Sequence, residues 1–297
     1  MLQTIHNRAT SAVRKLTRHL QAPGSPVRHL RRAAHHALHP IRVSERRAAG
    51  RRFMEKLSPE IAATVEELRE TGVANFNAHL DPKLLAELDA HYQNVLLPRA
   101  SATESAKTHP FFFELTRPED RRADDILVRF ALQDPVLAAV AAYLKTAPFF
   151  RTVKVIESRG IAQTKWQASQ LWHLDYADSR AVWLWVYLTD VNTVENGPYT
   201  YLPVAASKRV QNSFFPRRIL DAEIDNSPLA SEVRRVTGPR LTSFLVDSTS
   251  VYHMGSRLAE GQKRCIYTAS FIDPVYDQTV IQASTPLPGD RRLLVVR

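Results

Sequence analysis

The sequence predicts a mainly β domain with flanking helices, and two observations carry that prediction. The second half of the chain holds four segments of strand-like composition, one of which, 181–188, is an unbroken apolar and aromatic run. The others are 199–203, 241–246 and 265–272. The first half holds helix-start signals instead, so we expect helices to pack against one sheet.

Three helices are expected before these strands. The segment 58–72 opens on Ser-Pro-Glu, an N-cap followed by proline at the first helical position, and closes on Thr-Gly. A short strand is expected to follow at 73–76. Asp-Pro at 81–82 begins a second helix, and the segment 134–145 repeats the same device for a third.

Two further segments shape the expected site. Residues 162–172 lack Gly and Pro, which favours an extended, polar-lined strand. Gln163, Lys165 and Gln167 would then share one face, lining either a cavity or solvent. Residues 205–239 form a long stretch of low periodicity between strands. Such stretches are typical of lids and specificity loops, so we expect this one to overhang the mouth of the site.

The motif that carries chemistry is Trp172-His173-Leu174-Asp175, together with a distant His253. Side chains at i and i+2 lie on one face of a strand, and the later histidine can come from a neighbouring strand. Two histidines and one carboxylate form the facial triad that holds Fe(II) and leaves coordination positions open. The sequence therefore predicts a metal site, which is also the catalytic site, at His173, Asp175 and His253.

An isolated His-x-Asp pair is more often an ordinary core or surface feature than a metal site. The prediction rests on the whole set: the pair, the distal His253, strand-like segments between them, and Arg264 on the last of these segments. A Zn(II) metallohydrolase would use a similar set of ligands. It would not need that arginine.

From about residue 57 to residue 274 the chain resembles the phytanoyl-CoA dioxygenase family of Fe(II)/2-oxoglutarate-dependent oxygenases. The matching pieces are Gln170-Leu-Trp-His-Leu-Asp175, Trp185-Val-Tyr-Leu-Thr-Asp190, Glu195-Asn-Gly-Pro198, Tyr201-Leu-Pro203, Ser207-Lys208, Val251-Tyr-His-Met-Gly-Ser256 and Arg264. One piece departs from the family pattern. Where relatives carry Pro-Gly-Ser-His, this chain has Pro203-Val-Ala-Ala-Ser207, which alters that turn and leaves the iron ligands in place.

The resemblance implies a double-stranded β-helix, a cupin-like jelly roll whose two sheets enclose the iron. It assigns His173, Asp175 and His253 as the iron ligands. It also assigns Arg264 to the far carboxylate of 2-oxoglutarate, a role that suits a guanidinium because its two prongs match a carboxylate.

Three other residues are weaker candidates beside the cosubstrate. Arg257 competes with Arg264 but lies in a turn. Trp185 aligns with a family aromatic near the cosubstrate, although core packing explains it equally well. Gln163 is a further candidate for the cosubstrate pocket. By strand alternation Cys265 should face away from Arg264 and serve only in packing.

The resemblance implies a dioxygenase that couples decarboxylation of 2-oxoglutarate to succinate with hydroxylation of an unactivated C–H bond in a small molecule. Fe(II), 2-oxoglutarate and O2 are the implied cofactor and cosubstrates, and ascorbate should help in vitro. Asp175 favours hydroxylation, or another oxidation such as desaturation, because related halogenases replace that carboxylate with a small residue. Two alternatives stay open: a non-catalytic jelly-roll binding protein with a vestigial metal site, and a metallohydrolase on the same fold. Basic residues near the triad and on 205–239 hint at an acidic substrate.

Composition and charge divide the chain in two. Residues 1–52 hold Lys15 and 11 arginines against one acid, Glu45, a net charge of +11, whereas the whole chain of 297 residues carries +10. Residues 53–297 are therefore close to neutral. We expect them to form the oxygenase domain, with residues 1–52 as a separable basic arm. Apolar residues recur at helical spacing from Leu2 to Leu20, as in a basic amphipathic helix.

Several roles compete for this basic arm, including a disordered, solubilising tail. A basic amphipathic helix can make peripheral contact with an anionic membrane, and an Arg-rich N-terminus can be an organellar transit peptide. Nucleic-acid binding is not expected, because the arm has no aromatic residue before Phe53. One cysteine excludes an internal disulfide framework and fits a reducing compartment, so the expected location is cytoplasmic, with peripheral membrane contact left open.

Overall fold

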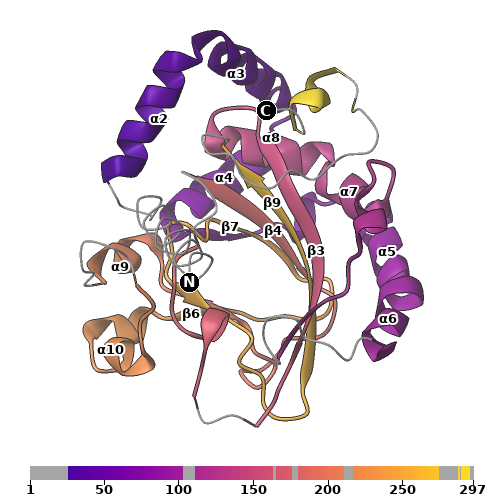
Figure 1. The fold of residues 1–297 in the computed structure, drawn as a ribbon, viewed down its shortest axis with the longest axis vertical. Coiled ribbons are helices and arrows are strands. Elements are labelled where there is room, and N and C mark those ends of the chain that lie inside the picture. The colour runs from indigo at the N-terminus through magenta and orange to yellow at the C-terminus, as the bar shows by residue number, and fades with distance from the viewer. Residues whose placement is uncertain are drawn as a thin grey trace, which may run out of the picture.

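Two β-sheets and a layer of helices make up the computed structural model (Figure 1). The structure describes residues 26–102, 111–162, 165–175, 180–210, 217–273, 287 and 289–294. Helices from the first half of the chain lie on the outer side of the larger sheet. Residues from both sheets line one cavity between them.

The larger sheet has six antiparallel strands in the order β1-β7-β4-β9-β3-β2. Their bounds are Val73–Asn75 (β1), Phe112–Glu114 (β2), Phe149–Arg159 (β3), Ala181–Tyr187 (β4), Ser243–Val246 (β7) and Lys263–Ile272 (β9). The expected strands at 73–76, 181–188, 241–246 and 265–272 are thus confirmed with small shifts of their ends. The long strand β3 was not among those expected.

The smaller sheet has the order β6-β5-β8, with bounds Arg234–Val236 (β6), Tyr199–Tyr201 (β5) and His253–Met254 (β8). A backbone bridge between His173 and His253 adds the motif segment to this sheet. From β4 to β9 the chain passes back and forth between the two sheets. That alternation is the double-stranded β-helix, so the expected fold class is confirmed.

Helices from the first half of the chain lie on the larger sheet, and local signals mark the starts of two of them. The helices are Pro59–Thr71 (α4), Pro82–His91 (α5), Leu97–Ala102 (α6), Ile126–Ala131 (α7) and Asp134–Leu144 (α8), with a π-helical turn at Tyr92–Leu96 (η2). Ser58 and Asp81 accept hydrogen bonds from the first turns of α4 and α5, and Gly72 ends α4 with a φ of 82°. Asp134 differs from expectation: Gln133 is the N-cap residue of α8, and Asp134 pairs with Lys56.

Short 3-10 turns lie at Asn77–His79 (η1), Pro118–Arg121 (η3), Ala168–Gln170 (η4), Pro228–Glu232 (η5) and Gly289–Leu294 (η6). Among the described residues, no single helix has the length and apolar composition to cross a membrane. The segment Pro118–Ala131 taken together with α8 passes that test only as a pair bent by 77°. Most of α8 is buried in the core against the larger sheet.

Strand alternation divides the larger sheet between two environments. On β3, Val153 and Val155 pack into the core beneath the helices, and on β9 Cys265 and Tyr267 do the same. Their neighbours along each strand line the cavity. Burial raises the pKa of the Cys265 thiol to about 12, so this side chain packs in the core as expected and remains a thiol.

The segment 162–172 is not the strand that its composition favours. Gln163 lies outside the described residues, and Lys165 and Gln167 are exposed on an irregular stretch that leads into η4. The side chain of Gln170 accepts a hydrogen bond from the Gln167 backbone at 3.2 Å and donates one to the Ser256 carbonyl at 3.0 Å. These local side-chain bonds replace the strand ladder until Trp172.

The segment 205–239 also differs from expectation, because its described residues form part of the barrel wall. It includes most of α9 (Val204–Arg209), α10 (Asp221–Asp225), η5 and β6, and Ile219 forms a bridge with Trp172. Its apolar side chains cluster with Trp172 on the side of the smaller sheet that faces away from the cavity. None of its described residues lines the cavity. For them, the prediction of a lid over the mouth is wrong.

The expected boundary between residues 52 and 53 falls inside a helix. α2 (Pro26–Leu38) and α3 (Pro40–Met54) precede α4, and α3 packs against α8 with Ala49 and Gly50 buried. A Cβ on Gly50 would lie 2.6 Å from the backbone of Thr146, so only glycine permits this approach. Buried Arg46 donates to the carbonyl oxygens of Ala147 and Leu293, both at 2.8 Å. Residues 40–52 therefore belong to the body, and the expected apolar stripe from Leu2 to Leu20 lies outside the described residues.

Candidate metal centre

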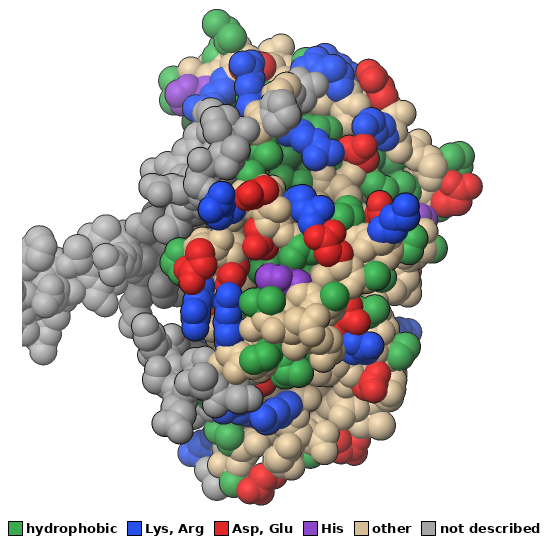
Figure 2. Space-filling model, turned by 90° about the vertical axis from the view of Figure 1, so that its right-hand side faces the viewer, with side chains coloured by type: hydrophobic (Ala, Val, Ile, Leu, Met, Phe, Trp, Pro, Cys, Tyr) green, Lys and Arg blue, Asp and Glu red, His purple; other side chains and the backbone are tan. Residues whose placement is uncertain are grey.

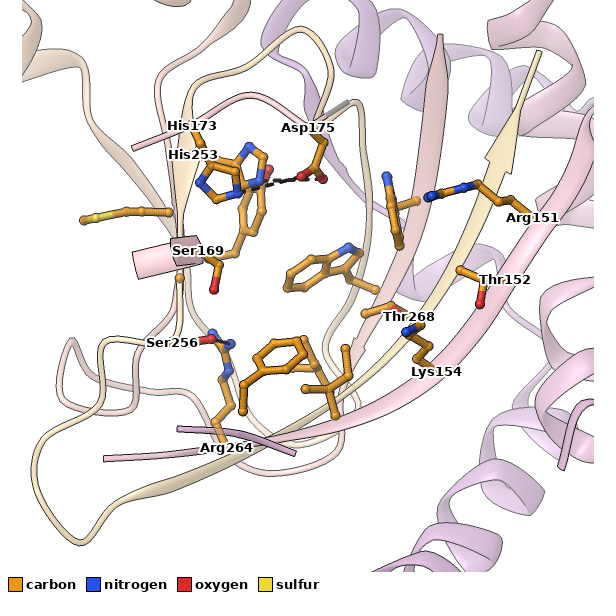
Figure 3. A pocket seen from close by; sticks show the side chains of 18 of the residues that line it. Arg151, Thr152, Lys154, Ser169, His173, Asp175, His253, Ser256, Arg264 and Thr268 are labelled. Carbon is orange, nitrogen blue, oxygen red and sulfur yellow. Dashed lines mark hydrogen bonds and ion pairs between the residues drawn. The ribbon is translucent and has the colours of Figure 1, made fainter. Parts of the chain in front are cut away.

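His173, Asp175 and His253 lie together at the inner side of the smaller sheet (Figure 3). The backbones of His173 and His253 exchange hydrogen bonds, each N–H donating to the other's carbonyl at 2.9 Å. Asp175 follows two residues later, and its N–H donates to the Ser248 carbonyl at 2.9 Å. The predicted cross-strand neighbours and i, i+2 spacing therefore bring the three side chains to one point.

The distances suit a single ion held between the three side chains. His173 Nε2 lies 3.7 Å from Asp175 Oδ1, and His253 Nε2 lies 3.8 Å from Asp175 Oδ2. One ligand atom from each residue lies within 4.8 Å of the others. Since metal–ligand bonds to nitrogen and oxygen are about 2.0–2.2 Å long, ligand atoms at this spacing can reach a common ion with small side-chain shifts.

Backbone carbonyls orient both histidines. His173 Nδ1 donates to the Leu171 carbonyl at 2.7 Å, and His253 Nδ1 donates to the Val251 carbonyl at 3.0 Å. With the proton on Nδ1, the lone pair of each Nε2 faces Asp175 and can bind a metal. Burial and the neighbouring His253 lower the pKa of His173 to about 3, so this imidazole is neutral at physiological pH.

A second group of histidine and carboxylates, His91, Asp120 and Asp125, also brings ligand atoms within 4.8 Å of one another. Its carboxylates already have structural partners. Asp120 pairs with Arg99, and Asp125 caps α7 by accepting from Leu127 N at 2.8 Å. This group therefore supplies a natural control for the first one.

The candidate metal site opens into a cavity of about 1150 Å³ between the two sheets. The larger sheet contributes side chains from β3, β4 and β9, and the smaller sheet contributes Tyr199 and His253. The turn η3 lies at the rim through Pro118 and Glu119. This volume is at the upper end of the range for small-molecule sites, and it accommodates a cosubstrate and a substrate together.

Arg264 reaches the same cavity from β9 and is only 1% exposed. Its guanidinium donates to the Gly197 carbonyl and to the hydroxyl of Ser256 at 3.0 Å. No carboxylate of the described residues lies within ion-pairing distance of it. A buried cation without a counterion is costly, so Arg264 is placed to take an anionic ligand.

Arg257 is engaged elsewhere. Its guanidinium forms a two-pronged ion pair with Asp221 at 2.7 and 2.8 Å and lies over the Trp166 ring at 5.0 Å. It does not line the cavity that holds the triad. Of the two arginines considered for the cosubstrate, only Arg264 shares a cavity with His173, Asp175 and His253.

Buried polar atoms without partners concentrate around this cavity. The atoms concerned are Trp183 Nε1, Trp185 Nε1, Tyr199 Oη, Arg264 Nε and Thr268 Oγ1, which have no hydrogen-bond partner although their residues line it. Native proteins seldom leave such atoms unpaired. A ligand rich in carboxylate and keto oxygens would satisfy them, so the residues present fit both a metal ion and 2-oxoglutarate.

The model of the phytanoyl-CoA dioxygenase (PhyH) family matches residues 68–228, slightly more than half of the chain. The chain belongs to this family. The matched span of this PhyH-family protein includes His173 and Asp175, and the fold supplies His253 and Arg264 beyond it. No curated protein matches the sequence.

Two solved structures resemble this PhyH-family protein in fold. EctD from S. alaskensis with 2-oxoglutarate and 5-hydroxyectoine is 18% identical, with a TM-score of 0.52 over 72% of this chain and 76% of that chain. AviO1 from Streptomyces viridochromogenes Tue57 is 17% identical, with a TM-score of 0.51 over 73% of this chain and 96% of that chain. At such low identity the likeness shows a shared fold.

Trp185 and Tyr199 lie in the cavity wall of this PhyH-family protein. Trp185 contacts Tyr199 edge-on at 5.0 Å between ring centroids, and Tyr199 stacks on the His253 ring at 5.1 Å with 21° between planes. The Tyr199 hydroxyl is buried without a hydrogen-bond partner. Tyr199 fixes the orientation of His253 from the side opposite His173.

The cavity face of β3 was missed at the level of sequence. Arg151, Thr152, Lys154 and Ile156 line the cavity from this strand (Figure 3). The aromatic and β-branched residues of 149–156, with apolar and polar residues alternating over 152–155, are a strand signal that could have located it. Which of the two faces meets the site depends on the neighbouring strands and is not visible in the sequence.

Proposed function

We propose that this protein is a 2-oxoglutarate-dependent oxygenase that uses His173, Asp175 and His253 to hold one Fe(II). The observation that carries the proposal is the convergence of the three ligand atoms with both imidazoles already turned by backbone carbonyls. Two neutral histidines and one carboxylate are the ligand set of this iron class. The bound iron and 2-oxoglutarate would supply an oxidant able to attack an unactivated C–H bond.

In this function each residue of the site has a defined role. Asp175 contributes negative charge, because His253 and His173 hold its pKa below the ordinary value although burial acts in the opposite direction. Arg264, steadied by Ser256, anchors the far carboxylate of 2-oxoglutarate through its two-pronged guanidinium. The aromatic wall of Trp185 and Tyr199 excludes water from the reacting face.

We propose hydroxylation rather than halogenation as the reaction on the grounds of Asp175. Its carboxylate faces both Nε2 atoms and would occupy one coordination position. A halogenase needs that position for a halide. The substrate is a small molecule that enters the cavity from the rim formed by η3.

Succinate formation tests the proposal without knowledge of the substrate. The full chain, supplied with Fe(II), ascorbate and 2-oxoglutarate in air, should release succinate slowly above the protein-free blank. His253→Ala should reduce that release to the blank, because the site loses one of its three metal ligands while the backbone bridge to His173 remains. His91→Ala, from the second histidine and carboxylate group, should retain it.

The alternatives give different results in the same assay. A binding protein with a vestigial site would release no succinate from wild-type protein. A metallohydrolase would prefer Zn(II) and would be insensitive to 2-oxoglutarate. If succinate release by folded, Fe(II)-loaded wild-type protein never exceeds that of the blank, the proposed oxygenase function is excluded.

We also propose that the N-terminal helices dock on an anionic membrane surface. Leu30 and Leu38 of α2 are 69% and 75% exposed and lie at helical spacing with the exposed Ala34 and Ala37. Ile41, at the start of α3, is 84% exposed. Figure 2 shows basic and hydrophobic side chains side by side at the upper end of the molecule, the end at which α3 lies in Figure 1. An apolar stripe flanked by arginines complements anionic lipid in both polarity and charge.

A further inference from the structure

A β-bulge in β3 adds a cation to the cavity. Phe150 pairs with Phe271 and Thr152 pairs with Ser270, so Arg151 between them has no partner in the register with β9. Phe150 packs in the core beneath the helices, whereas Arg151 and Thr152 both line the cavity. Strict alternation would allow only one of two consecutive residues to face the cavity, and the extra residue allows both. The bulge thus directs an arginine side chain inward.

The direction of Arg151 is visible in Figure 3, where the side chain leaves β3 on the Asp175 side of the cavity. Lys154 follows on the same face of β3, further toward Arg264. A single strand therefore presents two cations along the wall opposite the metal ligands. Bulges beside active sites re-aim side chains in this manner.

The cavity carries more positive than negative charge. Among the described lining residues the cations are Arg121, Arg122, Arg151, Lys154 and Arg264, and the carboxylates are Glu119 and Asp175. Arg264 and Asp175 have parts in binding the cosubstrate and the metal. Of the rest, Lys154 and Arg121 share the carboxylate of Glu114, and Arg122 pairs with Asp124. Arg151 lies near enough to Asp175 to help lower the pKa of that carboxyl. The wall formed by β3 is therefore cationic.

Neighbouring strands add further donors beside these cations. Thr152 and Trp183 flank Ser270 in one row across the sheet, and Lys154 and Trp185 flank Thr268 in the next. Trp183 Nε1 and Thr268 Oγ1 are buried without partners in these rows. Indole N–H groups donate only, so the wall offers several donors around one aromatic surface.

We infer that the substrate of the proposed oxygenase is an organic anion whose carboxylate or phosphate binds Arg151 and Lys154. Its apolar part lies against Trp183, and its reacting carbon faces the metal ligands. This inference rests on the proposed function, because it names the substrate class of the same site. A guanidinium and an ammonium in a partly desolvated wall hold a carboxylate or phosphate by charge-assisted hydrogen bonds.

Binding of paired probes tests the inference independently of turnover. The probes are phenyl phosphate against phenol, and octanoate against octanol. Each is titrated into the full chain containing Fe(II) and saturating 2-oxoglutarate without oxygen, so that Arg264 is occupied, and tryptophan fluorescence reports binding. Each anion should bind at least about tenfold more tightly than its neutral partner, as expected for hydrogen bonds to charged groups.

Variants locate the effect. Arg151→Gln and Lys154→Met should each remove most of the anion preference, whereas Arg151→Lys should keep part of it. Arg129→Gln, which alters an exposed ion pair with Glu87 outside this cavity, should keep all of it. Melting curves identify variants that fail to fold. Because Arg151 and Lys154 are tested separately, the inference can still be tested if one of the two variants does not fold.

Each remaining outcome is decisive. Equal binding of anion and neutral partner, no binding of either, or an anion preference that survives in both Arg151→Gln and Lys154→Met would overturn the inference. Arg151 would then serve only to position Asp175. Succinate release by the same wild-type preparation in air separates this failure from failure of the proposed oxygenase itself.

Discussion

The carbonyl oxygens of Leu171 and Val251 determine the tautomer and the ring orientation of the two histidines. Each carbonyl accepts a hydrogen bond from the protonated Nδ1 of its histidine, which leaves Nε2 facing Asp175. These carbonyl groups lie two residues before each histidine, a spacing that the extended backbone repeats at both sites. The residues His173, Asp175 and His253 could be found from their spacing in the sequence, but this orientation could not.

Arg264 and Arg257 provide a matched test at the residue scale. Arg264→Lys keeps the charge but loses the two-pronged geometry, so the KM for 2-oxoglutarate in the succinate assay should rise about tenfold or more. Iron binding should be unchanged, because Arg264 is not a ligand. Arg257→Lys should alter the KM far less, since its partner is Asp221. A larger rise for Arg257→Lys would show that the anchor has been assigned to the wrong arginine.

At the scale of elements, local signals succeeded where the chain folds locally. The Ser58 and Asp81 caps located α4 and α5, because a side-chain oxygen that satisfies the first N–H groups works regardless of tertiary context. The segment 162–172 failed, because Gln170 bonds to the backbone of Gln167 and Ser256 instead of a strand. The hydrogen bond from Gln170 to Ser256 joins residues 86 positions apart, so it leaves no local pattern in the sequence.

The bulge at Arg151 shows the same limit. Residues 149–159 could have been recognised as a strand, but the extra residue exists only relative to β9. Without the register, alternation cannot place both Arg151 and Thr152 on the cavity face. The cations proposed to bind the substrate therefore depend on a register that the sequence does not show, whereas the His173–Asp175 pair is a short motif that can be found in the sequence.

At the scale of the whole molecule, the boundary between the basic and the neutral part of the sequence differs from the boundary at which the folded body begins. The excess positive charge lies before residue 53, but the body begins near Pro40, where α3 packs on α8. The oxygenase domain thus includes a basic helix whose Arg46 is buried. Composition alone cannot reveal this, because the burial of Arg46 depends on carbonyl groups of Ala147 and Leu293, both distant in sequence.

Truncated chains test both the boundary and the membrane proposal. A chain that starts at Pro40 should melt with the full chain, whereas one that starts at Phe53 should melt about 5 °C lower or more, because it loses the packing of α3 on α8. The full chain should sediment with phosphatidylserine vesicles at low salt and be released as salt screens the attraction. The chain from Pro40, which lacks α2, should remain in solution.

The two halves of this experiment can fail separately. Equal melting of the full chain and the chain from Phe53 would restore the boundary at residue 53. Equal sedimentation of the full chain and the chain from Pro40, or none by either, would contradict docking through the N-terminal helices.

The central claim, that His173, Asp175 and His253 together hold one iron, is tested most directly by metal content. After anaerobic equilibrium dialysis against Fe(II), wild-type protein and His91→Ala should each retain about one iron per chain, because a facial triad binds a single ion. His173→Ala, Asp175→Ala and His253→Ala should retain none, with melting curves showing that each is folded. Iron retained by the three triad variants, or lost from His91→Ala alone, would contradict the account.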